Sequence, residues 1–114
     1  EFSSSNIAIA RRDKALLLMG FRSYDDYLKS DLWKMIRGIV FGINSRCCVC
    51  SSPASQAHHL NYSIDALEGK PSAIEFCIVS MCDLCHNKVH FKGSQFLIGR
   101  GSRKKLRKLV AKHS

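Results

Sequence analysis

The sequence contains no apolar run approaching the roughly 20 residues that a membrane-spanning helix needs, so we expect no membrane segment and no membrane partner. A secretory signal is not predicted either, because no small-residue cleavage site follows the short apolar run at residues 15–19. We therefore expect an intracellular protein, either cytoplasmic or associated with the nucleoid. Internal repeats are also lacking, and 114 residues suit one small domain, whose limited core often needs a metal or a disulfide.

Acidic residues are absent beyond Asp83. Residues 1–83 carry nine Lys or Arg and nine Asp or Glu, so the whole formal charge of +9 lies after them. Such one-sided charge indicates a polyanionic partner, with nucleic acid as the first choice, while a solvated basic tail is the plainer interpretation. For the first interpretation we predict phosphate contacts from six cations near the C-terminus: Arg100, Arg103, Lys104, Lys105, Arg107 and Lys108.

Six cysteines are present, and four of them form two C-x2-C pairs, Cys47 with Cys50 and Cys82 with Cys85. Paired spacing with histidines nearby is typical of a zinc site rather than of a disulfide framework. Four thiolates fill all the positions of a tetrahedral zinc ion, so we expect a structural site that is closed to substrate. The two remaining cysteines, Cys48 and Cys77, are then predicted to be packing thiols.

Four of the five histidines lie at positions 58, 59, 86 and 90. His86 and His90 are four residues apart, which places them on one face of a helix, whereas adjacent side chains in a strand, such as His58 and His59, point to opposite faces. Three of the four histidines therefore fit an open imidazole site with water and phosphate completing the metal shell. The fourth is free to act as a base. A single histidine is more often structural, but this group favours catalysis.

Patterning predicts an α+β fold. Helices are expected over residues 7–19 with Gly20 as the stop, over residues 24–28, and over residues 32–40 with a cap at Ser30 or Asp31. Two strands are expected next, at residues 56–62 and 76–81, joined by a polar connection at residues 63–72. A helix then starts near Cys82 and ends at Gly93, and Ser102 caps a last basic helix over residues 103–112.

Four motifs are similar to those of a known family. They are Tyr24-x2-Tyr27-Leu28-x-Ser30-x2-Trp33-x3-Arg37, Cys47-x2-Cys50, His58-His59-Leu60-x-Tyr62 and Met81-Cys82-x2-Cys85-His86-x3-His90. Together they resemble the HNH endonucleases, in the subgroup that holds a four-cysteine zinc, over residues 24–91. The resemblance implies a ββα-metal (His-Me finger) core that cuts phosphodiester bonds in DNA. It also implies three parts of the chain: a leader and N-terminal helix (1–22), a nuclease domain (23–92) and a basic extension (93–114) that belongs to the same domain or forms a DNA-binding tail.

Residue roles follow from the same resemblance. His59 corresponds to the general base that takes a proton from the attacking water, and His58, His86 and His90 correspond to the ligands of one divalent cation. Magnesium or manganese is the first expectation, although three imidazoles also suit nickel, cobalt or zinc. A homodimer would supply the two active sites of a concerted double-strand cut, but no sequence feature specifies one.

One position departs from the family pattern. Cys77 stands where the family has an Asn or Asp that orients the base, and a thiol is a poor hydrogen-bonding substitute. Asn61 and Asn87 are the two candidates to replace that residue, and Asn87 is more typical of a helix surface. Two expectations result: an active metal-dependent DNA endonuclease, or a zinc-containing nucleic-acid-binding module whose catalytic centre has lapsed.

Overall fold

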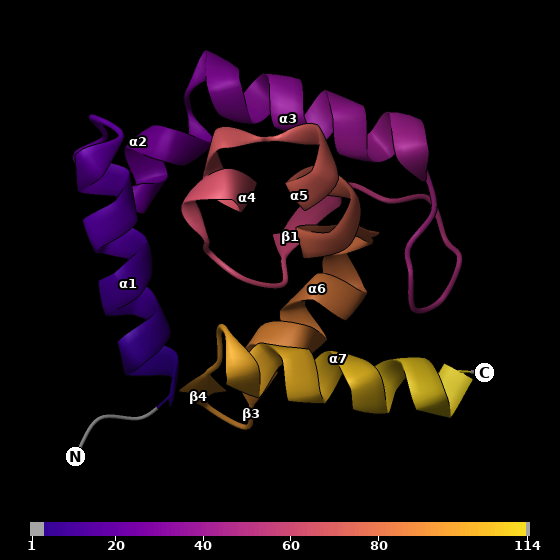
Figure 1. The fold of residues 1–114 in the computed structure, drawn as a ribbon. Coiled ribbons are helices and arrows are strands. Elements are labelled where there is room, and N and C mark those ends of the chain that lie inside the picture. The colour runs from indigo at the N-terminus through magenta and orange to yellow at the C-terminus, as the bar shows by residue number, and fades with distance from the viewer. Residues whose placement is uncertain (1–3, 114) are drawn as a thin grey trace.

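The computed structural model describes residues 4–113, which form helices and two small antiparallel sheets, an α+β architecture. Three helices, α1, α3 and α7, frame the shorter elements in Figure 1. The expected polar leader falls mainly on residues 1–3, which lie outside the described residues. The elements in chain order are α1 (Ser4–Leu18), α2 (Tyr24–Leu28), α3 (Asp31–Ile43), β1 (Gln56–His59), α4 (Ile64–Glu68), α5 (Pro71–Cys77), β2 (Ile78–Met81), α6 (Asp83–His90), β3 (Phe91–Lys92), β4 (Gln95–Phe96) and α7 (Arg100–His113).

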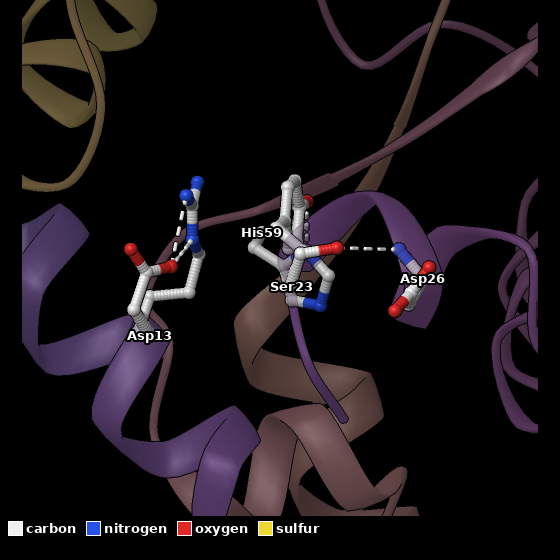
Figure 2. A network of polar contacts seen from close by, with 6 residues as sticks. Asp13, Ser23, Asp26 and His59 are labelled. Atoms are coloured by element: carbon white, nitrogen blue, oxygen red, sulfur yellow. Dashed lines mark hydrogen bonds and ion pairs between the residues drawn. The ribbon is translucent and has the colours of Figure 1, made fainter.

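The first three helices begin and end close to where their local signals predict. Gly20 follows the end of α1 with a positive φ of 94°, a conformation that costs glycine little. The Ser23 hydroxyl accepts a hydrogen bond from Asp26 N at the start of α2 (Figure 2), and the Ser30 hydroxyl accepts one from Trp33 N at the start of α3. Trp33, which belongs to the first of the four motifs, has its side chain buried in the main hydrophobic core.

The polar connection predicted at residues 63–72 is wrong. The segment contains α4, capped by Ser63 and ended by Gly69 in the left-handed conformation, and the first residues of α5, which starts at Pro71. Exposed polar residues hide these helices in a hydropathy pattern, whereas their buried residues, such as Leu67 and Ile74, join the core only in the folded chain. Helix α5 extends to Cys77, so the second strand begins at Ile78 and is shorter than the strand expected at residues 76–81.

Strands β1 and β2 pair in antiparallel register, with His58 opposite Val79 and His59 opposite Ile78. The chain then turns directly into α6, whose N-terminal cap is Cys82. This strand, strand, helix order places two adjacent histidines of β1 beside the helix that carries two more. Two predicted boundaries are wrong: the C-terminal end of α6 and the N-terminal start of α7. Gly93 lies in the turn between β3 and β4, beyond the end of α6 at His90, and Ser102 is buried inside α7, where its hydroxyl donates to Gly99 O.

Helix α7 packs against α6 and α1, which brings the C-terminal segment back to the N-terminal helix. None of the helices in residues 4–113 has both the length and the apolar character required to cross a membrane. The first set of buried side chains lies among α1 to α5, β1 and β2, and the second lies around Cys47, Met81, Val89 and Leu106. Two of the cysteines of the four-cysteine group, Cys47 and Cys85, are buried members of the second set.

Candidate metal centres

Four cysteines that are distant in sequence meet in space. The sulfurs of Cys47, Cys50, Cys82 and Cys85 lie within 4.8 Å of one another, and the sulfurs of Cys50 and Cys82 are 3.6 Å apart. A tetrahedral zinc ion with Zn–S bonds of about 2.3 Å places its sulfurs about 3.8 Å apart. All six cysteines lie in the described residues and all are free. The group therefore has the ligands and spacing to hold a structural metal ion such as zinc.

Backbone amides support these sulfurs. Val49 N donates to Cys47 Sγ at 3.4 Å, a contact that favours the Cys47 thiolate, and Cys85 N donates to Cys82 Sγ at 3.5 Å. A hydrogen bond with the Ser52 hydroxyl lowers the pKa of Cys50 to about 6, while burial raises the pKa of Cys85. A bound cation would offset the raised value, because metal binding competes directly with the proton.

The two predicted packing thiols lie outside this group. Cys48 packs against the second core, and burial raises its pKa to about 11, so its thiol stays protonated at neutral pH. Cys77 lies at the end of α5 against the first core. Neither sulfur belongs to the four-cysteine group.

Three histidines form a second group. The ring nitrogens of His58, His86 and His90 lie within 4.8 Å of one another, with His86 Nε2 and His90 Nε2 only 2.9 Å apart. His86 and His90 come from one face of α6, and His58 reaches them from the neighbouring strand β1. Three imidazoles on one side leave the remaining positions of a metal ion open to water or substrate.

Hydrogen bonding fits this group to a metal ion. His90 Nδ1 donates to Leu97 O at 2.7 Å, so its Nε2 carries the lone pair that points into the group. His58 Nε2 is buried and has no hydrogen-bond partner within the described residues, a costly state that a metal ion would relieve. Burial lowers the pKa of His58 to about 2 and of His86 to about 4, and like charges within the group lower both further. The imidazoles are therefore neutral at pH 7, the form that binds a metal.

His59 points to the other side of β1, as alternation in a strand predicts. Its ring stacks on Trp33 with centroids 4.9 Å apart, and Tyr24, Tyr27 and Tyr62 surround it. His59 Nδ1 lies 3.4 Å from the Tyr24 hydroxyl (Figure 2), and its Nε2 has no partner in the described part of the chain. Burial, assisted by the nearby Arg12, lowers the pKa of His59 to about 3, so this ring is also neutral.

A cavity of about 620 Å³ connects the two faces of the strand. His58, His86 and His90 line it together with His59 and Tyr24. The three-histidine group and the fourth histidine therefore open into the same space. A ligand that occupies this cavity would contact both.

Arg12 is a cavity residue that sequence reasoning missed. Its guanidinium lies 4.2 Å from the centre of the Tyr24 ring, and it pairs with Asp13, whose carboxylate accepts the dashed contact in Figure 2. The equal numbers of cations and acids in residues 1–83 concealed it, because a charge sum says nothing about which side chain enters a pocket.

Cys77 and Asn61 contact each other. Asn61 Nδ2 donates to Cys77 Sγ at 3.3 Å, and Asn61 Oδ1 accepts from Ser63 N, so the amide is engaged away from His59. The backbone nevertheless links this position to the histidine strand, since Leu60 N donates to Cys77 O at 2.7 Å, one residue after His59. Asn87 is exposed on α6 and lines the histidine cavity.

The six predicted phosphate-binding cations lie on α7 in two different environments. Arg103 Nη1 donates to Leu60 O at 2.7 Å, which fixes its side chain near the histidine strand. Arg100, Lys104, Arg107 and Lys108 are exposed, and Lys105 is half-buried.

Comparisons with family models, with curated proteins and with solved structures found no match to this chain. The resemblance to HNH endonucleases consequently rests on the four motifs, and function has to be inferred from the two metal-ligand groups and the cavity between the histidines.

Proposed function

We propose that the protein is a metal-dependent HNH endonuclease that hydrolyses phosphodiester bonds in DNA. One observation carries the proposal: three neutral imidazoles converge on a cavity that His59, the neighbour of His58 in the strand, lines as well. The β1, β2, α6 order supports a ββα-metal core, with the four cysteines as a structural zinc site at the start of its helix.

His58, His86 and His90 would hold the catalytic cation. A divalent ion bound there would stabilise the negative charge that develops on the phosphate and on the departing 3′ oxygen. The surrounding protein favours binding of this cation, because burial keeps all three rings neutral and the Leu97 carbonyl orients the His90 ring.

His59 would act as the general base. Its ring would take a proton from a water in the cavity that it lines, while the water oxygen attacks phosphorus and the bond to the 3′ oxygen breaks. Burial keeps the imidazole neutral but also makes it a weak proton acceptor. A phosphodiester anion in the cavity would raise its pKa again, because an opposite charge nearby favours the imidazolium.

The alternative function is nucleic-acid binding without cleavage. Two observations favour it: His59 is only 2% exposed, and the Asn61 amide bonds to Cys77 rather than to the base. A module of this kind would keep the structural zinc and the basic surface while lacking a competent base.

Plasmid nicking distinguishes the two functions. Supercoiled DNA is incubated with the protein in the presence of Mg²⁺, Mn²⁺ or Ni²⁺, beside His59→Ala and a matched control, His113→Ala, which removes the exposed histidine near the C-terminus. We expect nicking by the wild type and the control but not by His59→Ala. Binding without nicking by the wild type, or equal nicking by His59→Ala, would favour the binding module.

A further inference from the structure

We propose that the cleft between α1 and α7 binds a nucleic-acid strand through its phosphates, next to the histidine cavity. The cleft has a volume of about 850 Å³ and lies between the N-terminal helix, the segment after β1 and the beginning of α7. Four cations line it, two from each helix: Arg11, Lys14, Arg100 and Arg103. Its identification as a nucleic-acid site rests on the proposed function for the choice of ligand.

The charge of the cleft is not compensated by acids. No Asp or Glu lines the cleft, and Arg11, Lys14 and Arg100 form no ion pair within residues 4–113. Elsewhere on the surface, Lys29 and Lys70 each pair with an aspartate. Cations left unpaired in a concave surface raise the local concentration of an anion more effectively than cations spread over a convex one.

Close packing of the two helices builds this concavity. Gly99 has a positive φ of 64°, and a Cβ at this position would lie 2.7 Å from the Cβ of Ala8 on α1. A larger residue would force the helices apart. Figure 1 shows α1 and the start of α7 converging, although they come from opposite ends of the chain. Arg103 is held in place by its bond to Leu60 O.

The cleft adjoins the histidine cavity. Tyr62 lines both spaces, and Arg11 faces the cleft while its neighbour Arg12 faces the cavity. A strand whose scissile phosphate lies at the three histidines would pass Tyr62 and place its next phosphates against Arg11, Lys14 and Arg100. A single phosphate ion would occupy only a small part of about 850 Å³, so an extended phosphate chain fits the space better.

This arrangement changes which cations matter. The basic tail alone predicts a binding surface on α7, but only Arg100 and Arg103 of its six predicted residues line the cleft. The other two cleft cations belong to residues 1–83, whose formal charge is zero. Arg11 and Lys14 are therefore the critical test.

The experiment measures binding of fluorescein-labelled DNA, single-stranded and duplex, by anisotropy across a salt series without added divalent metal. We compare Arg11→Ala/Lys14→Ala with Lys29→Ala/Lys70→Ala, which removes the same number of positive charges from side chains that line neither cavity. We expect the cleft variant to lose about tenfold or more in affinity and to have a log-log salt slope shallower by about 2. The control should stay within twofold of the wild type. Melting curves establish that both variants are folded.

Two results would overturn the proposal. Equal affinity losses in the two double variants would mean that net charge, rather than the cleft, determines binding. Wild-type DNA affinity in the cleft variant, together with loss of binding to inorganic phosphate, would mean that the cleft holds a small anion. Nicking separates this proposal from the proposed function. If the wild-type protein nicks DNA and the cleft variant binds DNA as tightly as the wild type, only the cleft proposal is wrong. If the cleft variant binds DNA more weakly but the wild-type protein does not nick DNA, only the proposed nuclease function is wrong.

Discussion

The two metal-ligand groups share helix α6 but differ in their surroundings: one packs in a hydrophobic core and the other lines a cavity. The four cysteines lie at its N-terminus and pack with the second core, whereas His86 and His90 lie further along it and line a cavity. Four soft sulfurs complete a tetrahedral shell, and three imidazoles leave positions open. One short helix thus holds a group suited to stability beside a group suited to chemistry, and the cysteines are the ligands whose loss should affect the fold most.

Breaking the cysteine group should have the largest effect. We expect Cys85→Ser to lose its metal and its cooperative thermal transition, because a structural zinc contributes about 10–16 kcal/mol to folding in small zinc domains. Metal analysis and melting curves check this. Cys48→Ser is the matched control, since Cys48 adjoins the group without belonging to it. A fully folded, metal-free Cys85→Ser protein would contradict the structural role.

Removing a histidine ligand should affect the second ion alone. His86→Ala should keep one zinc per chain and its thermal transition while losing nicking and the affinity for the added divalent ion. His59→Ala should keep both metals and still reduce nicking by about 10² to 10⁴, the usual contribution of a general base. Isothermal titration with Mn²⁺ separates the two variants. If His59→Ala lost the ion as well, the division of roles between the adjacent histidines would be wrong.

Lowering the pH should reduce the stability of the fold through the buried His59. The pKa of His59 is lowered to about 3 in the folded protein, against about 6.5 when unfolded, so its titration has no effect on stability above pH 6.5 and stability falls as the pH drops toward 3. The loss approaches about 1.4 kcal/mol per pH unit for this one group. Urea unfolding between pH 7 and pH 5 should show a shallower pH dependence in His59→Phe, which keeps an aromatic ring on Trp33. Identical slopes in the two proteins would place the protonated ring in solvent.

Local signals predicted much of this molecule. The serines that cap α2 and α3, the Cys-x2-Cys pairs and the four-residue spacing of His86 and His90 all act over a few residues, so the sequence displays them directly. Alternation in a strand likewise predicts that His58 and His59 point to opposite faces. The four-cysteine group and a group of three of the four histidines were expected for these reasons, whereas the choice of His58 over His59 came from the family resemblance.

Long-range packing accounts for what was missed. Helices α4 and α5 look polar because only a few of their residues, such as Leu67 and Ile74, enter the core. The Leu97 carbonyl that fixes His90 comes from the segment after the β4 strand, and Arg12 enters the cavity from a helix far away in sequence. Neither contact leaves a pattern at its own position. The unpaired cations of α1 were hidden similarly by the balanced charge of residues 1–83.

The smallest expected effect concerns Cys77, where the chain departs from the HNH pattern. Cys77→Asn would place an amide beside Asn61, on the residue whose own carbonyl accepts from Leu60 N, and we expect nicking to rise several-fold because orienting groups around a site typically contribute 10- to 100-fold. The cost should be about 1 kcal/mol of stability, since the sulfur packs against the first core. Cys48→Asn, another partly buried thiol away from the base, controls for the loss of packing. A gain confined to Cys77→Asn would show that the histidine side of the strand is limited by orientation of its base, whereas no gain would mean that the Cys77 carbonyl already supplies the contact that matters.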